Sequence, residues 1–448
     1  MQKDISMNSA HWHGFTQMAH YDPLVIRRAE GSWLTTVDGR RLLDGVASLW
    51  CNVHGHSREE INQAIRTQLD RVAHVTTLGM SCDTTEELAS RLTLKTPGDL
   101  DHVFFSSDGS SAVEAAIKMA FQYWQQVDCG VGSSKVKYLA LDLAYHGDTT
   151  GAVSLGGIKY FHKLFSPILF SPLRGPLPCT YRLPAGVSPD QACEVYASQL
   201  ETIISGNRDE LAAVVVEPLV QGAAGMITHP AGLLQQIRAL CDRYDVLLIC
   251  DEVATGFGRT GSFFACQQEE VTPDILCLGK GLTSGYLPMA ATVARRKIFD
   301  AFLAPVEESR QFFHGHTFAG NPLAAAAALA SLDLFESDQT LHSLSGKEKR
   351  LKQELACLDD HQNVGSVRGR GLMYGIEVVQ DRESKSGFDS SKLIGRKICE
   401  RATEKGVWIR PLGDVIVLMP PLAIQEDEIV MLAAAVVESI QEVTFDHS

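Results

Sequence analysis

The stretch DILCLGKGLTSGYLPMA, residues 274–290, places Lys280 in a glycine-rich turn directly after an apolar run. Upstream, VLLICDE at 246–252 is a second apolar run, and it ends in Asp251. The two residues are 280 − 251 = 29 positions apart, which is enough for a strand, a connection and a second strand. Short apolar runs are typical of strands buried in a parallel sheet. The sequence therefore predicts an amine and a carboxylate at the ends of neighbouring strands.

This pair of side chains suits a pyridoxal 5'-phosphate site, where the lysine binds the coenzyme covalently and the carboxylate pairs with the pyridinium nitrogen. Each residue alone has a simpler interpretation, because a lysine in a glycine loop is usually solvated and an aspartate after a strand often caps a helix. Ionised groups beside buried strands are costly without partners, so the two together favour the functional interpretation.

The middle of the chain alternates short β-rich runs with helical periods. The expected strands are VFFSS, KYLALD, LAAVVVEP, VLLICDE and DILCLG, and the expected helices include 61–75, 110–126 and 232–245. This alternation predicts an α/β fold with a mostly parallel sheet covered by helices on both faces. Ligands of such sheets bind beyond the carboxyl ends of the strands. The residues at those predicted ends are Ser106 to Gly109, Glu217, Asp251 and Lys280.

The segment VFFSSDGSSAVE at 103–114 predicts a strand, a turn and a helix start. Backbone N–H groups and hydroxyls at a helix N-terminus form an anion site, which would involve Gly109 and Ser110. Ser111 and Glu114 also fit a capping box, which alone explains the serines. A third turn, Tyr145-His146-Gly147-Asp148, offers either an aromatic ring for stacking on a flat cofactor or a half-buried surface tyrosine.

Other motifs are weaker. GFGRTG at 256–261 matches a dinucleotide fingerprint, but it does not open a helix directly after a strand. His54-Gly55-His56 and His314-Gly315-His316 lack a further ligand at metal spacing, so no metal is expected. The sequence contains no HExxH and no GxSxG motif, so zinc peptidase and α/β-hydrolase functions have no support.

The composition limits the partners. The net charge is 40 − 54 = −14 and no lysine or arginine run is present, which argues against nucleic acid and anionic membranes. Eleven cysteines without a CxxC pair indicate a reducing compartment. The N-terminus lacks an apolar core for a signal peptide and the longest apolar stretch, 323–332, is too short to cross a bilayer. We therefore expect a cytoplasmic protein.

The chain divides into three segments by its pattern of expected strands and helices. Residues 1–57 contain a hairpin signal at Asp38-Gly39 and form the N-terminal segment of a small domain. Residues 58–334 form the large domain that carries the predicted cofactor site. Residues 335–448 return to a small α+β domain, with expected strands GLMYGIEVV and VIVLMPP and an exposed loop at 380–390.

Together these residues resemble class III (subgroup II) aminotransferases of PLP fold type I. The resemblance extends from HWHGFTQM at 11–18 to IRPLGDVIVLMPP at 409–421, and its signature is ICDEVATGFGRTG followed by LGKGL. Four further motifs are similar to the branch that aminates 8-amino-7-oxononanoate to 7,8-diaminononanoate in biotin biosynthesis, usually with S-adenosylmethionine as amino donor. They are LWCNVHGH, AYHGDT, FHGHTFAGNP and VWIRPLGD.

The resemblance implies a role for each matching residue. Lys280 would bind pyridoxal phosphate and move the proton, Asp251 would pair with the pyridine nitrogen, and Tyr145 would stack on the ring. The implied cofactor-binding set is completed by Gly109, Ser110, Glu217, Val253, His316 and Thr317. The implied substrate-binding set is Phe15, Leu49, Trp50, Tyr145, Lys280, Gly315 and Arg410. Because Thr317 would reach the phosphate of the other subunit, the resemblance implies a homodimer with shared active sites, acting on small molecules.

Three positions depart from the pattern of the adenosylmethionine-using members. Phe15 stands where a tyrosine is frequent, Leu49 where the first residue of a Trp-Trp pair is frequent, and His316 where a proline is common. A relative that uses lysine as donor has a similar pattern, so lysine remains an alternative donor. The chain could also be another class III ω-amino acid, diamine or polyamine aminotransferase, an aminomutase, or a non-enzymatic binding protein on the same fold.

Overall fold

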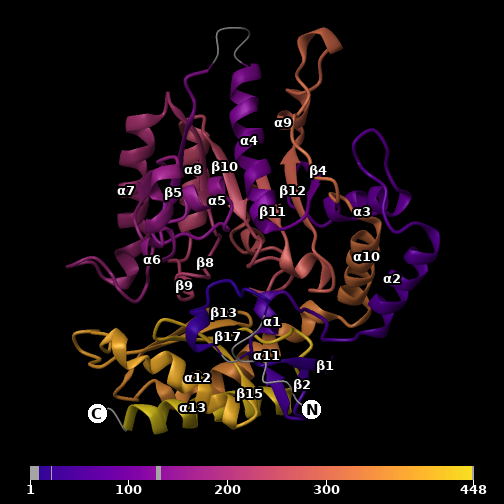
Figure 1. The fold of residues 1–448 in the computed structure, drawn as a ribbon. Coiled ribbons are helices and arrows are strands. Elements are labelled where there is room, and N and C mark those ends of the chain that lie inside the picture. Colours follow the sequence, from indigo (N-terminus) through magenta and orange to yellow (C-terminus); the bar gives the residue numbers. More distant parts are fainter. Residues whose placement is uncertain (1–9, 22, 128–132, 446–448) are drawn as a thin grey trace.

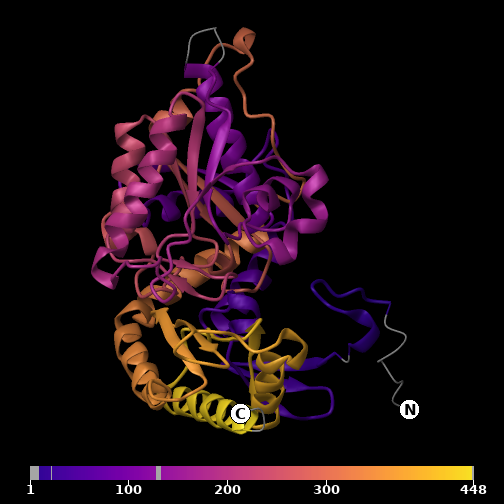
Figure 2. The same cartoon turned by 90° about the vertical axis from the view of Figure 1, so that its left-hand side faces the viewer.

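The computed structural model describes residues 10–21, 23–127 and 133–445. A large part built on a seven-stranded sheet lies above a smaller part that carries both the N-terminal strands and the C-terminal helices (Figure 1). Residues 10–21 project from the side of the smaller part (Figure 2). Residues 1–9, on which much of the signal-peptide expectation rests, lie outside the described residues.

The large sheet has the strand order β4-β12-β11-β10-β7-β5-β6. Only β12 runs antiparallel to its two neighbours, so the sheet is mostly parallel and the predicted fold class is confirmed. Its strands are β4 (Leu100–Ser106), β5 (Lys137–Leu141), β6 (Leu173–Gly175), β7 (Leu211–Val216), β10 (Leu247–Asp251), β11 (Ile275–Leu278) and β12 (Ala290–Arg295).

Strand β10 shows why its run is apolar at every position. Leu248 and Cys250 belong to the hydrophobic core on one face of the sheet, whereas Leu247 and Ile249 belong to the core on the other face. A strand buried on both faces has no polar side to alternate with. The helices of the large part are α2 (Glu59–Arg71), α3 (Asp83–Thr93), α4 (Gly109–Val127), α5 (Thr150–Leu155), α6 (Lys159–His162), α7 (Ala192–Asn207), α8 (Leu233–Arg243), α9 (Arg296–Asp300) and α10 (Pro322–Ser337).

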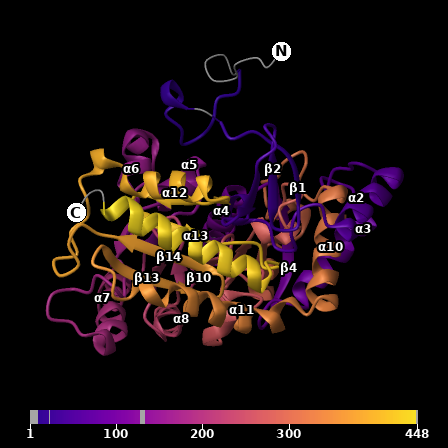
Figure 3. The same cartoon turned by 90° about the horizontal axis from the view of Figure 1, so that it is seen from below.

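The smaller part joins the two ends of the chain. The predicted hairpin at Asp38-Gly39 connects β2 (Trp33–Thr36) to β3 (Arg41–Asp44), and β15 (Val407–Trp408) pairs in parallel with β3. Figure 3 shows α12 (Ile394–Glu404) and α13 (Glu426–Phe445) side by side. The remaining elements here are β1 (Ile26–Glu30), α1 (Ala47–Trp50), α11 (Thr340–Leu355), β13 (Val364–Arg370), β14 (Met373–Val378), β16 (Arg410–Leu412) and β17 (Val415–Leu418).

The alanine-rich stretch 323–332 lies within α10 and is largely buried, as expected from its composition. Helix α10 continues past the predicted boundary at 334/335 to Ser337. The domain boundaries at 57/58 and 334/335 stay predictions. In the part of the chain that the structure describes, each helix is too short or too polar to cross a membrane.

Candidate active site

A cavity of about 280 Å³ lies at the carboxyl ends of the parallel strands. Its walls come from residues that follow β4, β5, β7, β10 and β11, together with α1 from the smaller part. This is where ligands of open α/β sheets bind. The predicted site residues that line the cavity are Trp50, Gly109, Ser110, Tyr145, Glu217, Asp251, Val253 and Lys280.

Asp251 is the last residue of β10, and its side chain is held from two directions. Its Oδ1 accepts a hydrogen bond from the backbone N–H of Val253 at 3.0 Å, and its Oδ2 lies 2.8 Å from Nδ1 of His146. Both side chains are buried, and Nε2 of His146 has no partner among the described residues. His146 therefore fixes the orientation of the carboxylate. The turn that contains His146 is recognisable in the sequence, but this role is not, because it depends on a contact with a distant strand.

Lys280 begins a 3-10 turn directly after β11 and lies in the left-handed region, with φ +40°. Burial lowers the pKa of its amine, while the carboxylates of Asp251 and Glu217 act in the opposite direction. Among the described residues Lys280 forms no ion pair, and its Nζ lies 5.1 Å from the centre of the Trp50 ring. An amine with a lowered pKa is neutral more often, so it can act as a nucleophile or a base near neutral pH.

The position of Trp50 depends on a strained backbone segment. Ala47, Ser48 and Trp50 all have positive φ, at 50°, 62° and 66°. Asp44 holds this segment, because its Oδ2 accepts a hydrogen bond from the N–H of Ser48 at 2.7 Å and lies 2.9 Å from Nε2 of His56. Backbone strain of this kind persists only where the surroundings impose it, and it concentrates at functional sites.

Glu217 connects two loops of the cavity. Its Oε1 accepts a hydrogen bond from the N–H of Tyr145 at 3.0 Å, and its Oε2 accepts one from the N–H of Gly222 at 2.9 Å. The Tyr145 hydroxyl donates to Oδ2 of Asp148 at 2.8 Å, which holds the ring at the cavity wall. Burial raises the pKa of Glu217 to about 7, because the charged carboxylate is poorly solvated there.

We expect the raised pKa of Glu217 to make the stability of the apoprotein depend on pH. Its ordinary value is 4.5 and its folded value is about 7, so between these pH values the folded state retains a proton that the unfolded state has released. The unfolding free energy then decreases as pH rises, by about 3 kcal/mol for this group. In Glu217→Gln the decrease between pH 5 and 8, measured by urea denaturation, should be smaller by about that amount. Glu87→Gln, at an exposed position, is the control. If the unfolding free energy depends equally on pH in both variants, the raised pKa of Glu217 is contradicted.

The start of α4 corrects one sequence interpretation. The cap is Asp108, whose Oδ1 accepts a hydrogen bond from the N–H of Ser111 at 2.9 Å. Ser111 and Glu114 form no capping box, because both lie inside the helix and Oε1 of Glu114 accepts instead from Gly151 N–H at 2.7 Å. The residue that caps the helix thus stands three positions earlier than the predicted one, directly after the strand and its turn.

The cavity fits the phosphate and the ring of pyridoxal phosphate. Among the described residues the N–H groups of Gly109 and Ser110 have no acceptor, so the helix N-terminus is free to bind an anion. A side chain at Gly109 would lie 2.5 Å from Cγ1 of Val253, so only glycine lets the two segments approach this closely. Lys280 and Asp251 line the same cavity, and in the part of the chain that the structure describes no ion pair joins them.

Several predicted site residues lie outside the cavity lining, and their roles stay predictions. Phe15 is exposed and contacts Phe161 at 5.3 Å between ring centres; Phe161 in turn lies 6.5 Å from the ring of Tyr145. Leu49 is half exposed, and Arg410 is exposed at the start of β16. Gly315, His316 and Thr317 lie on a segment that contacts α4 through Lys118, away from the cavity of their own chain. In the described residues no group of three or more potential ligands could hold a metal ion.

Comparison with known proteins agrees with this geometry. The sequence model of the family "Aminotransferase class-III" matches residues 16–442. The adenosylmethionine-8-amino-7-oxononanoate aminotransferase of Geobacter sulfurreducens is 49% identical over 437 residues, which cover 97% of this chain and 96% of that protein. An omega-aminotransferase of Caulobacter vibrioides is 35% identical over 427 residues, covering 94% of each protein.

The solved structures give the same result. The crystal structure of adenosylmethionine-8-amino-7-oxononanoate aminotransferase from Methanocaldococcus jannaschii superimposes with a TM-score of 0.91 at 42% sequence identity, covering 97% of each chain. The family match covers nearly the whole chain, and it includes every residue that lines the cavity. The chain therefore belongs to the class III aminotransferases, which are pyridoxal phosphate-dependent transaminases of fold type I.

Proposed function

We propose that the chain is the aminotransferase that converts 8-amino-7-oxononanoate to 7,8-diaminononanoate in biotin biosynthesis. The observation that carries the proposal is the 49% identity over 437 residues to a protein named for that reaction, together with similar matches in other species. S-adenosylmethionine is the proposed amino donor, because each of these relatives is named for it.

Each of these residues of the cavity has a separate role in the proposed amino transfer. Bound pyridoxal phosphate supplies an electron sink for the substrate carbanion. Lys280 would hold the coenzyme, and its neutral amine would move a proton at Cα as general base and acid. Asp251, oriented by His146, would supply the negative charge that pairs with the ring nitrogen. The N-terminus of α4, with Gly109 and Ser110, binds the phosphate.

The substrate pocket is proposed to extend from Trp50 towards the exposed side chains around it. Arg410 would bind the carboxylate of 8-amino-7-oxononanoate with its two-pronged guanidinium group. Phe15 and Leu49 would border the donor, and Gly315, His316 and Thr317 would reach the cavity of a second subunit. The homodimer and the cytoplasmic location are part of this proposal.

Amino donor and acceptor can be separated in two half-reactions. Purified enzyme in its pyridoxal phosphate form, mixed with S-adenosylmethionine alone, should lose the visible absorbance of the bound coenzyme, and 8-amino-7-oxononanoate should then restore it. Lysine serves as the alternative donor in a parallel experiment. Failure of 8-amino-7-oxononanoate to restore the absorbance, with rapid turnover of pyruvate and a simple diamine, would refute the proposed acceptor.

The alternative donor has one specific observation in its favour. Compared with the adenosylmethionine-using members, Leu49 removes one aromatic side chain from the proposed pocket, and Phe15 lacks the hydroxyl of the frequent tyrosine. If lysine rather than S-adenosylmethionine bleaches the coenzyme, the acceptor stays the same and only the donor changes. The variant Leu49→Trp should then gain activity with S-adenosylmethionine.

A further inference from the structure

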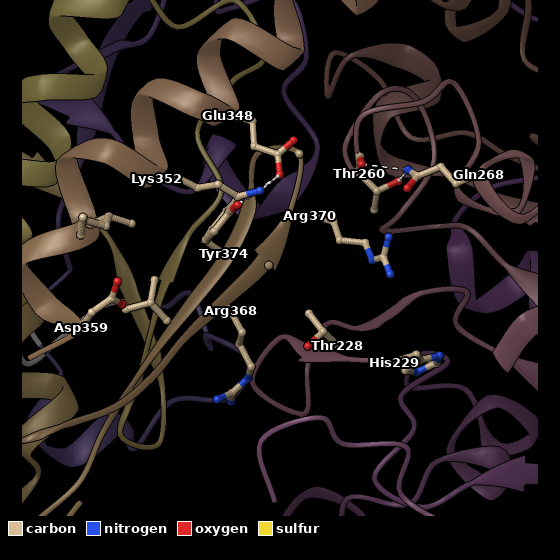
Figure 4. Close-up of a pocket in the computed structure, with 15 residues that line it drawn as sticks. Thr228, His229, Thr260, Gln268, Glu348, Lys352, Asp359, Arg368, Arg370 and Tyr374 are labelled. Atoms are coloured by element: carbon tan, nitrogen blue, oxygen red, sulfur yellow. Dashed lines mark hydrogen bonds and ion pairs between the residues drawn. The ribbon is translucent and has the colours of Figure 1, made fainter. Parts of the chain in front are cut away.

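A second cavity, of about 680 Å³, lies between the large part and the smaller part of the protein. None of the residues in its wall belongs to the candidate active site. One wall comes from β9 (Ile227–Thr228) with His229, from Thr260, and from Gln268 on the 3-10 turn Ala265–Glu269. The facing wall comes from α11, β13 and β14 (Figure 4).

Three charged side chains in the wall of this cavity, Arg368, Glu348 and Lys352, are paired within the protein itself. Arg368 pairs with Glu377 at 2.6 Å and donates to the backbone carbonyls of Gly225 and Met226, at 2.7 and 3.0 Å. On α11, Glu348 pairs with Lys352 at 2.7 Å and accepts from the hydroxyl of Tyr374 at 3.2 Å. These groups therefore leave little unbalanced charge for a ligand.

Arg370 is different, because its guanidinium group extends into the space between Thr260 and Gln268 on one side and Thr228 and His229 on the other (Figure 4). Among the described residues it has no ion pair and no hydrogen bond. Its place is fixed by the next residue: Gly371 has φ +58°, and a Cβ there would lie 2.6 Å from the backbone oxygen of Arg259. The turn after β13 is thus pressed against residues 259–261, and Arg370 is presented from a rigid position.

The wall opposite Arg370 offers a buried polar group without a partner. His229 is 4% exposed, and its Nε2 has no hydrogen-bond partner among the described residues. Burial lowers its pKa to about 3, and the charge of Arg370 acts in the same direction, so the imidazole is neutral. A neutral imidazole can carry its proton on Nε2 and donate it to an oxygen atom. The hydroxyl of Thr228, which lies 2.8 Å from that of Thr180, is a further polar group of this wall.

We propose that this cavity binds the carboxylate or phosphate group of a small molecule, held by Arg370 and supported by His229. A guanidinium group matches both oxyanions with two parallel hydrogen bonds, and an unpaired partly buried arginine is completed by such a partner. The acidic side chain Asp359 lies on the other side of the cavity in Figure 4 and is exposed, so its charge is screened by solvent. The site goes beyond the proposed function and requires no particular amino donor or acceptor.

Isothermal titration of the pyridoxal phosphate-loaded enzyme tests the proposal. Sodium phosphate and sodium succinate are titrated separately at constant ionic strength, with sodium chloride as the reference anion. We expect saturable binding of one anion per chain, and the tighter of the two probes identifies the oxyanion. Loss of a charge-assisted contact should weaken that binding about tenfold or more in Arg370→Gln. Arg370→Lys keeps the charge but loses the two-pronged geometry, so its affinity for the anion should lie between that of the wild type and that of Arg370→Gln.

Two control variants keep the test decisive. Arg396→Gln removes an exposed arginine on α12 that pairs with Glu400, so it should bind the anion as the wild type does. Arg410→Gln reports on anions that enter the proposed substrate pocket instead. Unchanged affinity in Arg370→Gln, loss of binding only in Arg410→Gln, or absence of saturable binding in the wild type would each overturn the proposal. If Arg370→Gln fails to fold, the Arg370→Lys titration decides by the same criteria.

Discussion

Lys280→Ala should be folded and almost inactive, with turnover reduced by about a thousandfold or more. The substitution removes the amine that binds the coenzyme and moves the proton, and positioned acid–base groups alone contribute about 10²- to 10⁴-fold. The variant should also lose the visible absorbance of covalently held coenzyme. Because burial lowers the pKa of Lys280, its charged form is disfavoured in the folded protein, and the apoprotein should unfold at no lower temperature than the wild type.

Two further variants complete the test: one keeps the positive charge at position 280 without a neutral amine, and the other is a control at an exposed lysine. Lys280→Arg keeps a positive charge but cannot become neutral, so it should be as inactive as Lys280→Ala. Lys349→Ala removes an exposed lysine on α11 and should leave turnover and absorbance unchanged. Steady-state rates and absorbance spectra of the three proteins are the measurements. Substantial turnover in Lys280→Ala would remove the central assignment of the active site.

Asp251→Asn should keep much of the coenzyme but lose at least about a hundredfold in rate, equivalent to about 2.7 kcal/mol of activation free energy. The amide has nearly the size of the carboxylate and can still accept from the N–H of Val253. The negative charge is lost, and a counter-charge at a buried position 5% exposed is effective because solvent does not screen it. Single-turnover measurements would show whether the chemical step, and not binding, is slowed.

The neighbouring carboxylate provides a matched control. Glu252 is also buried, but its oxygens accept from the N–H groups of Ala265 and Cys266 at 2.6 and 2.8 Å, outside the cavity. Glu252→Gln should therefore reduce stability by about 1–3 kcal/mol and leave the rate constant of the folded enzyme nearly unchanged. Equal rate losses in Asp251→Asn and Glu252→Gln would show that the effect of Asp251 is structural.

The sequence predicted the parts of the fold that depend on local pattern. Strands such as β10 were recognisable because burial on both faces makes every position apolar, and the chemistry-bearing residue stands at the end of the run. Strand β12 was not among the expected strands, and its antiparallel direction could not be predicted either, because an apolar run has the same composition whichever way the strand points. The capping residue of α4 was predicted wrongly, since SSDGSS offers several side chains that can cap a helix and only the fold selects Asp108.

Contacts between distant residues were beyond local reasoning. His146 and Asp251 are 105 positions apart, and their hydrogen bond exists only because β5 and β10 end at the same edge of the sheet. The strained backbone at Ala47, Ser48 and Trp50 leaves no signature in residue type, since none of the three is a glycine. The guanidinium of Arg370, which has no partner among the residues that the structure describes, is likewise placed by the packed turn after β13.

The parallel pairing of Leu43 with Val407 closes a loop of 407 − 43 = 364 residues. During synthesis, the ribosome therefore exposes β3 long before its neighbour β15 exists, and the nascent chain carries an unprotected strand edge for most of its translation. A protein truncated before β15 would keep that edge of β3 permanently unpaired. Such a fragment is expected to aggregate even though every strand of the large sheet is present.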